Sequence, residues 1–273
     1  MFMHRRLVLS MLLSLLSVGA WKATAWGHKT AASTVLASVN RVETSSAVPA
    51  GTILPLRLEK AISLKDAQRG QAVESKIAQD VPLPDGTKIP MKSQVRGSIV
   101  SFDTDTDGPG AKLTLKFDRL DDRKETLNIT TYLRAIASSR AVQSAQLPHS
   151  GADMGSPGGW SDTVQIGGDL RFGDGGEVRN RAKQKVGKGV VGGVLVHVSA
   201  NLALGCDGPN GSDYPQALWV FSSDACGVYD LKNVKVAHAG KGEPVGEITL
   251  HFEKEDMRVE AGAGILLRVV SKP

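Results

Sequence analysis

The sequence has little of what most catalytic motifs are built from. Its 273 residues include two cysteines, and the six histidines do not cluster. It has no H-E-x-x-H, no Gly-x-Ser-x-Gly and no paired metal-ligand spacing, which removes the usual motifs of metalloproteases and serine hydrolases. A Ser/His/Asp triad assembled from distant residues is not excluded. We expect a protein without catalytic activity, with a secreted hydrolase as one alternative.

A strongly basic character is also missing once the N-terminus is set aside. The formal net charge is +5, but three of the 33 positive residues (Arg5, Arg6 and Lys22) precede the expected cleavage site. That leaves 30 positive against 28 acidic residues, a net charge of +2 for the remainder. A balance this close to neutral gives no support to nucleic-acid binding, and we predict no nucleic-acid partner.

The N-terminus carries a long apolar run. Two arginines are followed by a largely apolar stretch over residues 7–21, and Ala23-Thr24-Ala25 places small residues at a cleavage site. The run is shorter than the roughly 20 residues of a membrane-spanning helix, although an uncleaved anchor is an alternative. We predict a signal peptide over residues 1–25 and a flexible spacer over 26–47. The protein is therefore expected in the periplasm or at the outer membrane of a bacterium.

The predicted export bears on whether the two cysteines form a disulfide. Cys206 and Cys226 are twenty residues apart, and an oxidising compartment favours one disulfide between them. Closing a loop of that size stabilises the fold by about 3 kcal/mol in the chain-entropy model. The alternative is a reactive pair, but the C-x-x-C spacing is absent.

The pattern of the chain predicts a mainly β fold. Residues 48–58, with the motif Val-Pro-Ala-Gly, and residues 259–269 share Val, Ala-Gly, Leu and Arg in register. Each looks like a glycine turn leading into a strand. Apolar and polar residues alternate over 112–118 and 247–253 as in strands with one wet face. We predict a small antiparallel barrel or sandwich in which the first and last strands lie near one another.

Five further segments complete the predicted organisation. An N-terminal β block (48–137) and a C-terminal β block (160–273) together complete one barrel-like domain. Residues 138–159 have few large apolar side chains and are expected to form a long surface loop. The glycine-rich apolar segment 186–205 is expected to be a buried strand or short helix, or else a membrane-facing or oligomer-forming segment. The disulfide loop (206–226) is expected to return as a strand at residues 218–221.

One acidic run has the alternation of a calcium loop. Asp103, Asp105 and Asp107 precede a glycine, and alternate positions present hard oxygen ligands. Thr114 stands where a bidentate glutamate belongs, and no helices flank the run. A weak Ca²⁺ site is one interpretation, an acidic solvated turn the other. We expect no other cofactor.

Residues 48–120 resemble the TrbI-type β-barrel module of bacterial conjugation and secretion proteins. The resemblance rests on a Pro-Ala-Gly-Thr strand at 49–52, a glycine turn at Gly70, the strand end Asp80-Val81 and a hairpin from Ile89-Pro90 to Gly97. Lys92 stands where the family has a glycine. The resemblance implies a β-barrel module within a secreted bacterial protein, and it does not extend to the multimeric channel of the family.

Taken together, these features predict a structural or interaction module of the cell envelope without catalytic activity. Envelope proteins or a second copy of the chain are the expected partners, and outer-membrane association is compatible with the export signal. The alternative is a glycan- or peptide-binding domain that uses the 138–159 segment and Trp160 or Trp219.

Overall fold

The computed structural model describes residues 48–104, 110–122, 125–150, 161–173, 175–208, 214–254 and 258–271 of the chain. The predicted signal peptide (1–25) and spacer (26–47) lie outside these ranges. Within them, no helix has the length and hydrophobicity of a membrane span.

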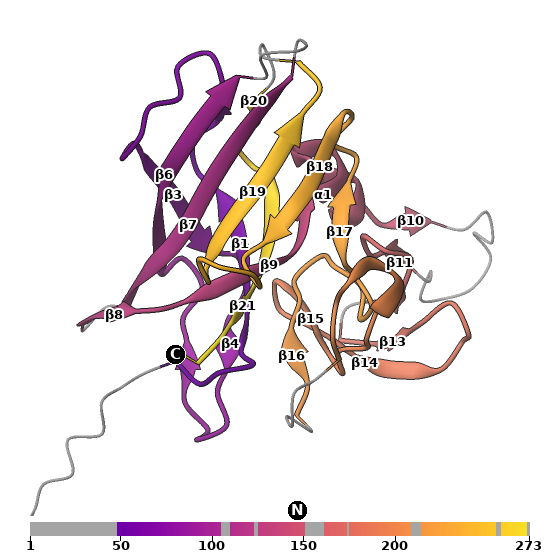
Figure 1. Ribbon diagram of the computed structural model, residues 1–273. Coiled ribbons are helices and arrows are strands. Elements are labelled where there is room, and N and C mark those ends of the chain that lie inside the picture. Colours follow the sequence, from indigo (N-terminus) through magenta and orange to yellow (C-terminus); the bar gives the residue numbers. More distant parts are fainter. Residues whose placement is uncertain are drawn as a thin grey trace, which may run out of the picture. The chain divides into compact units, whose positions relative to one another are not determined.

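The main sheet is mostly antiparallel and forms a nearly closed barrel (Figure 1). Its strand order is β17-β9-β21-β1-β3-β6-β7-β19-β18, and β8 pairs with β7 off this path. The strands are β1 (Ile53–Leu58), β3 (Ala72–Ile77), β6 (Gln94–Thr104), β7 (Ala111–Asp122), β8 (Glu125–Asn128), β9 (Thr131–Ala137), β17 (Gly227–Tyr229), β18 (Val234–Ala239), β19 (Glu247–Phe252) and β21 (Gly264–Val269). The predicted mainly β, barrel-like fold is therefore confirmed.

The first and last long strands are hydrogen-bonded neighbours. In antiparallel register Ile53 faces Arg268, and Arg57 faces Gly264. At the opposite end of the strand order, Gly240 follows β18 and lies against β9. A Cβ added to it would lie 3.1 Å from the carbonyl oxygen of Thr131. The glycine thus allows the end of β18 to approach β9 and nearly close the sheet.

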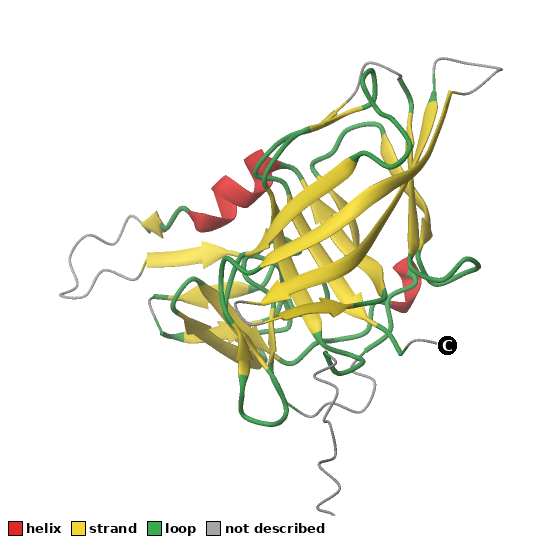
Figure 2. Ribbon diagram, turned by 90° about the vertical axis from the view of Figure 1, so that its left-hand side faces the viewer, coloured by secondary structure: helices red, strands yellow, loops and turns green. Residues whose placement is uncertain are grey.

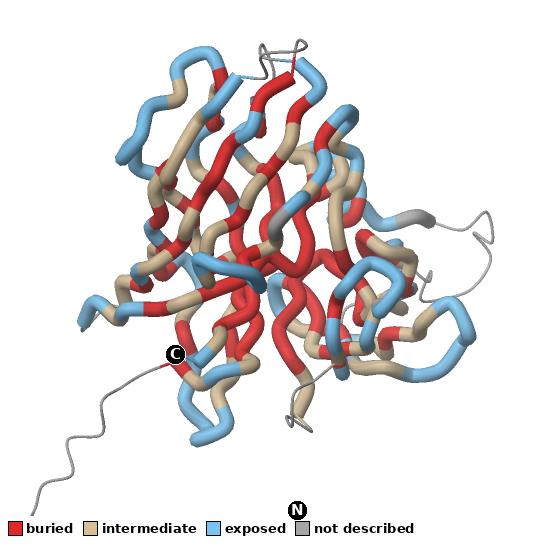
Figure 3. Tube along the Cα trace, in the orientation of Figure 1, coloured by how far each residue is buried: buried red, intermediate tan, exposed pale blue. Residues whose placement is uncertain are grey.

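The barrel interior is filled with apolar side chains. Figure 3 shows in red the parts of the chain that are buried. In β19 buried residues alternate with half-buried ones, and Ile248, Leu250 and Phe252 point inward, as predicted. Two short pairs of strands extend the barrel: β2 (Ile62–Ser63) with β20 (Arg258–Val259), and β4 (Val81–Pro82) with β5 (Lys88–Ile89).

A second sheet packs outside the barrel wall formed by β9, β21 and β1. Its order is β10-β11-β12-β13-β14-β15-β16. Figure 2 shows the strands of the structure in yellow and its helices in red. The strands are β10 (His149–Ser150), β11 (Ser161–Val164), β12 (Leu170–Phe172), β13 (Glu177–Arg179), β14 (Lys185–Val190), β15 (Gly193–Val196) and β16 (Gln216–Ala217). A second apolar core joins Ile53, Ala135 and Leu266 of the wall to Val194 and Val196. All six residues of β21 are consequently buried.

The segment 138–159, expected to be a loop, begins with a helix. Helix α1 (Ser139–Gln146) is capped by Ser138, whose hydroxyl accepts a hydrogen bond from the Ala141 amide at 3.0 Å. Its buried face consists of Val142 and Ala145. Because those are small residues, the segment lacks the large apolar side chains by which an amphipathic helix is usually recognised.

The glycine-rich segment 186–205 forms the hairpin of β14 and β15, followed by the short 3₁₀ helix η1 (Leu202–Leu204). Its glycines therefore do not serve close packing between helices. Residues 218–221, expected to be a strand, form a buried turn in which the Phe221 amide donates to the Leu218 carbonyl at 2.9 Å. Trp219 lies within this turn.

Candidate functional site

Two adjoining cavities open at the junction of the barrel and the second sheet. Their volumes are about 840 and 620 Å³, and both are lined by Gln146, Gly192 and Trp219. Volumes of this size are typical of ligand sites in proteins. We call the two cavities together the Trp219 groove. Its three shared residues come from α1, from the β14–β15 hairpin and from the turn after β16.

The backbone of Trp219 has an unusual conformation. Its φ is 56°, a left-handed value that costs a bulky residue about 1–2 kcal/mol. The Gln79 side chain holds it there, since its Oε1 accepts from the Trp219 amide at 2.7 Å. The same amide side chain pairs with both backbone groups of Val194, at 3.2 and 2.9 Å. One buried glutamine from the barrel thus fixes the floor of the groove.

Gly193 makes this arrangement possible. A Cβ at this position would lie 2.2 Å from the Gln79 Oε1 and 2.7 Å from the Trp219 Cα. Any side chain here would displace the glutamine, the tryptophan turn, or both. This close approach gives a physical reason for one of the glycines in the 186–205 segment.

The charged side chains around the groove are mostly cationic. Arg57, Lys76 and Lys92 line the smaller cavity, and Arg171 lines the larger one. Among the described residues, Glu59 is the one carboxylate in the lining, and it pairs with Lys76. The groove therefore carries an excess of positive charge, although the chain as a whole is close to neutral after its first 25 residues.

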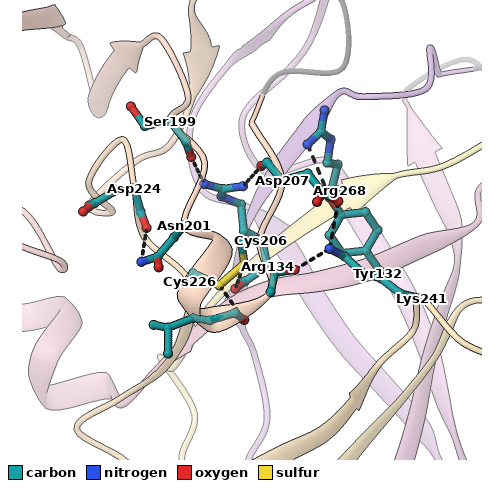
Figure 4. The surroundings of a disulfide bond; sticks show 12 residues. Tyr132, Arg134, Ser199, Asn201, Cys206, Asp207, Asp224, Cys226, Lys241 and Arg268 are labelled. Carbon is teal, nitrogen blue, oxygen red and sulfur yellow. Dashed lines mark hydrogen bonds and ion pairs between the residues drawn. A yellow bond between two sulfur atoms is a disulfide. The ribbon is translucent and has the colours of Figure 1, made fainter.

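The predicted disulfide between Cys206 and Cys226 is present, with Cα atoms 6.0 Å apart (Figure 4). Beside it lies Arg134 of β9, whose side chain is 1% exposed. The Arg134 guanidinium donates to the carbonyl oxygens of Asp207 at 2.7 Å and Ser199 at 2.6 Å. Burial lowers the pKa of this guanidinium from its ordinary value. The contacts tie the loops next to the disulfide to the barrel wall.

A second buried arginine makes a similar contact. Arg268 of β21 donates to the Gly208 carbonyl at 2.6 Å and to the Tyr132 hydroxyl at 3.3 Å. Lys241 lies 4.9 Å from the centroid of the Tyr132 ring and pairs with the Asp207 carboxylate at 2.9 Å (Figure 4). The hydrogen bond from Lys241 is the main cause that lowers the pKa of Asp207. These groups are mutually satisfied, so we interpret the cluster as structural.

Of the three predicted calcium ligands, Asp103 is the one that lies within the described residues. Asp103 lies near the end of β6, is exposed, and faces Lys112 across the strand pair. Asp105 and Asp107 lie outside the described residues, so the Ca²⁺ site stays a prediction. In the part of the chain that is described, no three His, Cys, Asp or Glu side chains are grouped to hold a metal ion.

Sequence reasoning singled out Trp219 and the 138–159 segment, and the structure brings Trp219 and Gln146 together in the groove. Trp160 lies outside the described residues. Gln79, Arg57 and Lys92 were not anticipated as site residues. No local signal marks Gln79, which contacts a residue 140 positions away. For Lys92 the sequence gives one indication, namely that the TrbI-type family has a glycine at this position.

Comparison of the chain with protein-family models, with curated proteins and with solved structures finds no match. The groove and the fold are therefore interpreted from their own geometry.

Proposed function

We propose that this chain is an exported, non-catalytic interaction module of the bacterial cell envelope that holds a partner in the Trp219 groove. The observation that carries the proposal is the pair of adjoining cavities sharing Gln146, Gly192 and Trp219. Strained backbone is often retained where a site must be held in one geometry, and Trp219 is such a residue.

Export is supported by the predicted signal peptide over residues 1–25. A disulfide in the folded chain is compatible with an oxidising compartment outside the cytoplasm. The resemblance of residues 48–120 to the TrbI-type module supports a role among envelope proteins. We place the protein in the periplasm or at the outer membrane on these grounds.

The residues that line the groove favour a binding role over hydrolysis. Among the described residues, the lining of both cavities contains no Ser, Cys, His or Asp side chain. A hydrolase of the Ser/His/Asp type needs a nucleophile and a base within hydrogen-bond reach of each other. The proposal therefore assigns the groove to recognition of a partner, which is an envelope protein or another copy of the chain.

The proposal is tested by filling the groove. Ala261 is exposed and lines the smaller cavity, so Ala261→Trp obstructs the groove without disturbing a core. Ala237→Trp adds the same side chain at an exposed position of β18 outside both cavities. In gentle envelope extracts of the bacterium that makes the protein, size-exclusion chromatography should give an assembly for the full chain and for Ala237→Trp.

The Ala261→Trp variant should elute as the monomer in the same experiment. If the wild-type chain is monomeric in the extract, or if all three proteins elute in the same assembly, the groove is not the interaction site. Circular dichroism of the purified proteins checks that both tryptophan variants are folded.

A further inference from the structure

We propose that the occupant of the Trp219 groove is an acidic peptide segment in extended conformation. This inference rests on the proposed function and specifies the chemistry of the partner. Its basis is the arrangement of two unpaired cations on the smaller cavity, with exposed apolar side chains of both cavities beside them.

Two of the groove cations are available to a ligand. Arg57 of β1 is exposed, and Lys92 lies in the turn between β5 and β6. Within the described residues, neither side chain makes a hydrogen bond or an ion pair, whereas Lys76 is paired with Glu59. An unpaired arginine and lysine on one cavity attract carboxylates, and the arginine can bind a carboxylate through two hydrogen bonds.

Lys92 occupies its place at a conformational cost. Its φ is 73°, in the left-handed region where glycine is favoured and other residues are strained. The turn is held by hydrogen bonds from the Lys92 amide to the Ile77 carbonyl at 2.8 Å and from Ser93 to Pro90 at 3.2 Å. A glycine would make the same turn with less strain. The lysine side chain is therefore best explained by what its ammonium group contacts in a complex.

Apolar side chains stand beside these cations. Val191, at the tip of the β14–β15 hairpin, is 97% exposed, and Met91, next to Lys92, is 40% exposed. The hairpin tip approaches Met91, since a Cβ on Gly192 would lie 3.8 Å from the Met91 sulfur. In an extended peptide, successive side chains point to opposite sides. Such a peptide can direct acidic residues to Arg57 and Lys92 and apolar residues to Val191 and Met91.

The lining of the groove favours a peptide over a sugar as its ligand. Sugar rings pack against open aromatic faces, but Trp219 is 4% exposed and offers no open ring face. Among the described residues it is the one aromatic side chain in the lining of either cavity. Trp219 thus forms part of the floor, and the charged and apolar rim provides the contacts.

The test uses fluorescence anisotropy with labelled octapeptides added to the full chain. One peptide alternates Glu with Val, and two controls alternate Lys or Ser with Val. We expect the Glu peptide alone to bind. Its affinity should decrease as salt rises from about 0.05 to about 0.5 M, because exposed charges are screened. Arg57→Gln and Lys92→Gly should each weaken binding about two- to fivefold, as expected for exposed ion pairs.

Each variant has a matched control. Arg69→Gln removes an exposed arginine that has no partner among the described residues and does not line the groove. Lys183→Gly replaces another lysine with left-handed φ, 63°, outside the groove. Both controls should bind the Glu peptide as the wild type does. Lys92→Gly should keep its urea midpoint or raise it, which separates lost binding from lost folding.

The outcomes distinguish this inference from the proposed function. If the three peptides bind equally and Ala261→Trp abolishes binding, the groove is a peptide site but its preference for acid is wrong. If no peptide binds and an anionic polysaccharide or anionic vesicles do, the peptide is the wrong occupant. If the Glu peptide binds all groove variants as well as the wild type, the groove is not its site.

Discussion

Left-handed backbone and buried charge are the two residue-scale features that organise the junction. Of the five non-glycine residues with positive φ in the described ranges, Lys92 and Trp219 line the groove. Arg134 and Arg268 are the two largest side chains that are fully buried there. A buried guanidinium is costly unless its donors are satisfied, and here backbone carbonyls of neighbouring loops accept from the terminal nitrogens of both arginines. The Arg134 Nε is buried and has no hydrogen-bond partner among the described residues. The two arginines thus link these loops to the barrel wall through hydrogen bonds.

Arg134 gives the sharpest test at this scale. Its planar guanidinium reaches the Ser199 and Asp207 carbonyls at once, while a lysine ammonium cannot span both in the same geometry. We expect Arg134→Lys to lower the free energy of unfolding by about 1–3 kcal/mol, because a buried carbonyl loses its donor. Urea unfolding followed by circular dichroism measures it. An unchanged midpoint would mean that water replaces the guanidinium without cost.

The exposed pair of Arg140 with Asp230 provides the control for that experiment. Arg140 lies on α1, and its side chain is 75% exposed. Arg140→Lys should therefore leave the urea midpoint nearly unchanged.

At the element scale, the N-terminus of α1 is fixed by a residue from a distant part of the chain. Asp230 accepts hydrogen bonds from Arg140 at 2.9 Å and from the capping residue Ser138 at 2.5 Å. These bonds, the one from Arg140 first, lower the pKa of Asp230 to about 2. Because α1 carries Gln146 into the groove, this contact also positions one wall of the site.

The lowered pKa predicts a pH dependence for Asp230→Asn. Asparagine tolerates the left-handed φ of 52°, so the variant removes the charge and leaves the backbone unstrained. An acid with a lowered folded-state pKa stabilises the fold above its unfolded value near 4, and this contribution is lost as the pH falls toward 2. We expect the variant to be about 0.5–1 kcal/mol less stable at pH 6. The difference should shrink toward zero at pH 2 in urea titrations, and a constant difference would contradict the assignment.

The elements that the sequence predicts well are those with one wet face. Alternation over 247–253 identifies β19, and the echo of residues 48–58 in 259–269 predicts that β1 and β21 are neighbours. Alternation is lost where a strand is covered on both sides, as in β21. Helix α1 has a serine cap but buries only Val142 and Ala145, which is too weak an apolar stripe to predict.

At the scale of the whole molecule, the groove could not be predicted because its parts are remote in sequence. Gln79 and Trp219 are 140 residues apart, and Arg57 reaches the same surface from the first strand. These remote residues come together because the second sheet covers one wall of the barrel. Packing the second sheet on β9, β21 and β1 creates both the second core and the cavities at its margin. Local patterns encode the sheets, whereas the site depends on how the sheets pack.

The disulfide and Arg134 together hold the loops that follow the second sheet at that wall. Cys226 immediately precedes β17, which pairs in parallel with β9, and Cys206 precedes Asp207, whose carbonyl accepts from Arg134. We expect replacing both cysteines by alanine to lower the free energy of unfolding by about 3 kcal/mol, mainly through the entropy of the unfolded chain. Urea unfolding measures this loss, and the wild type in reductant should reproduce it.

The contributions of the disulfide and of Arg134 to the free energy of unfolding should also depend on one another. If the disulfide holds the carbonyls in place for Arg134, removing it already weakens those hydrogen bonds. Arg134→Lys should then cost less in the cysteine-free chain than in the wild type, with an interaction of about 0.5–1 kcal/mol in the double-mutant cycle. Additive losses would show that the disulfide acts on the unfolded chain alone. In that case the loop geometry around Arg134 is set by the main sheet, through the parallel pairing of β17 with β9.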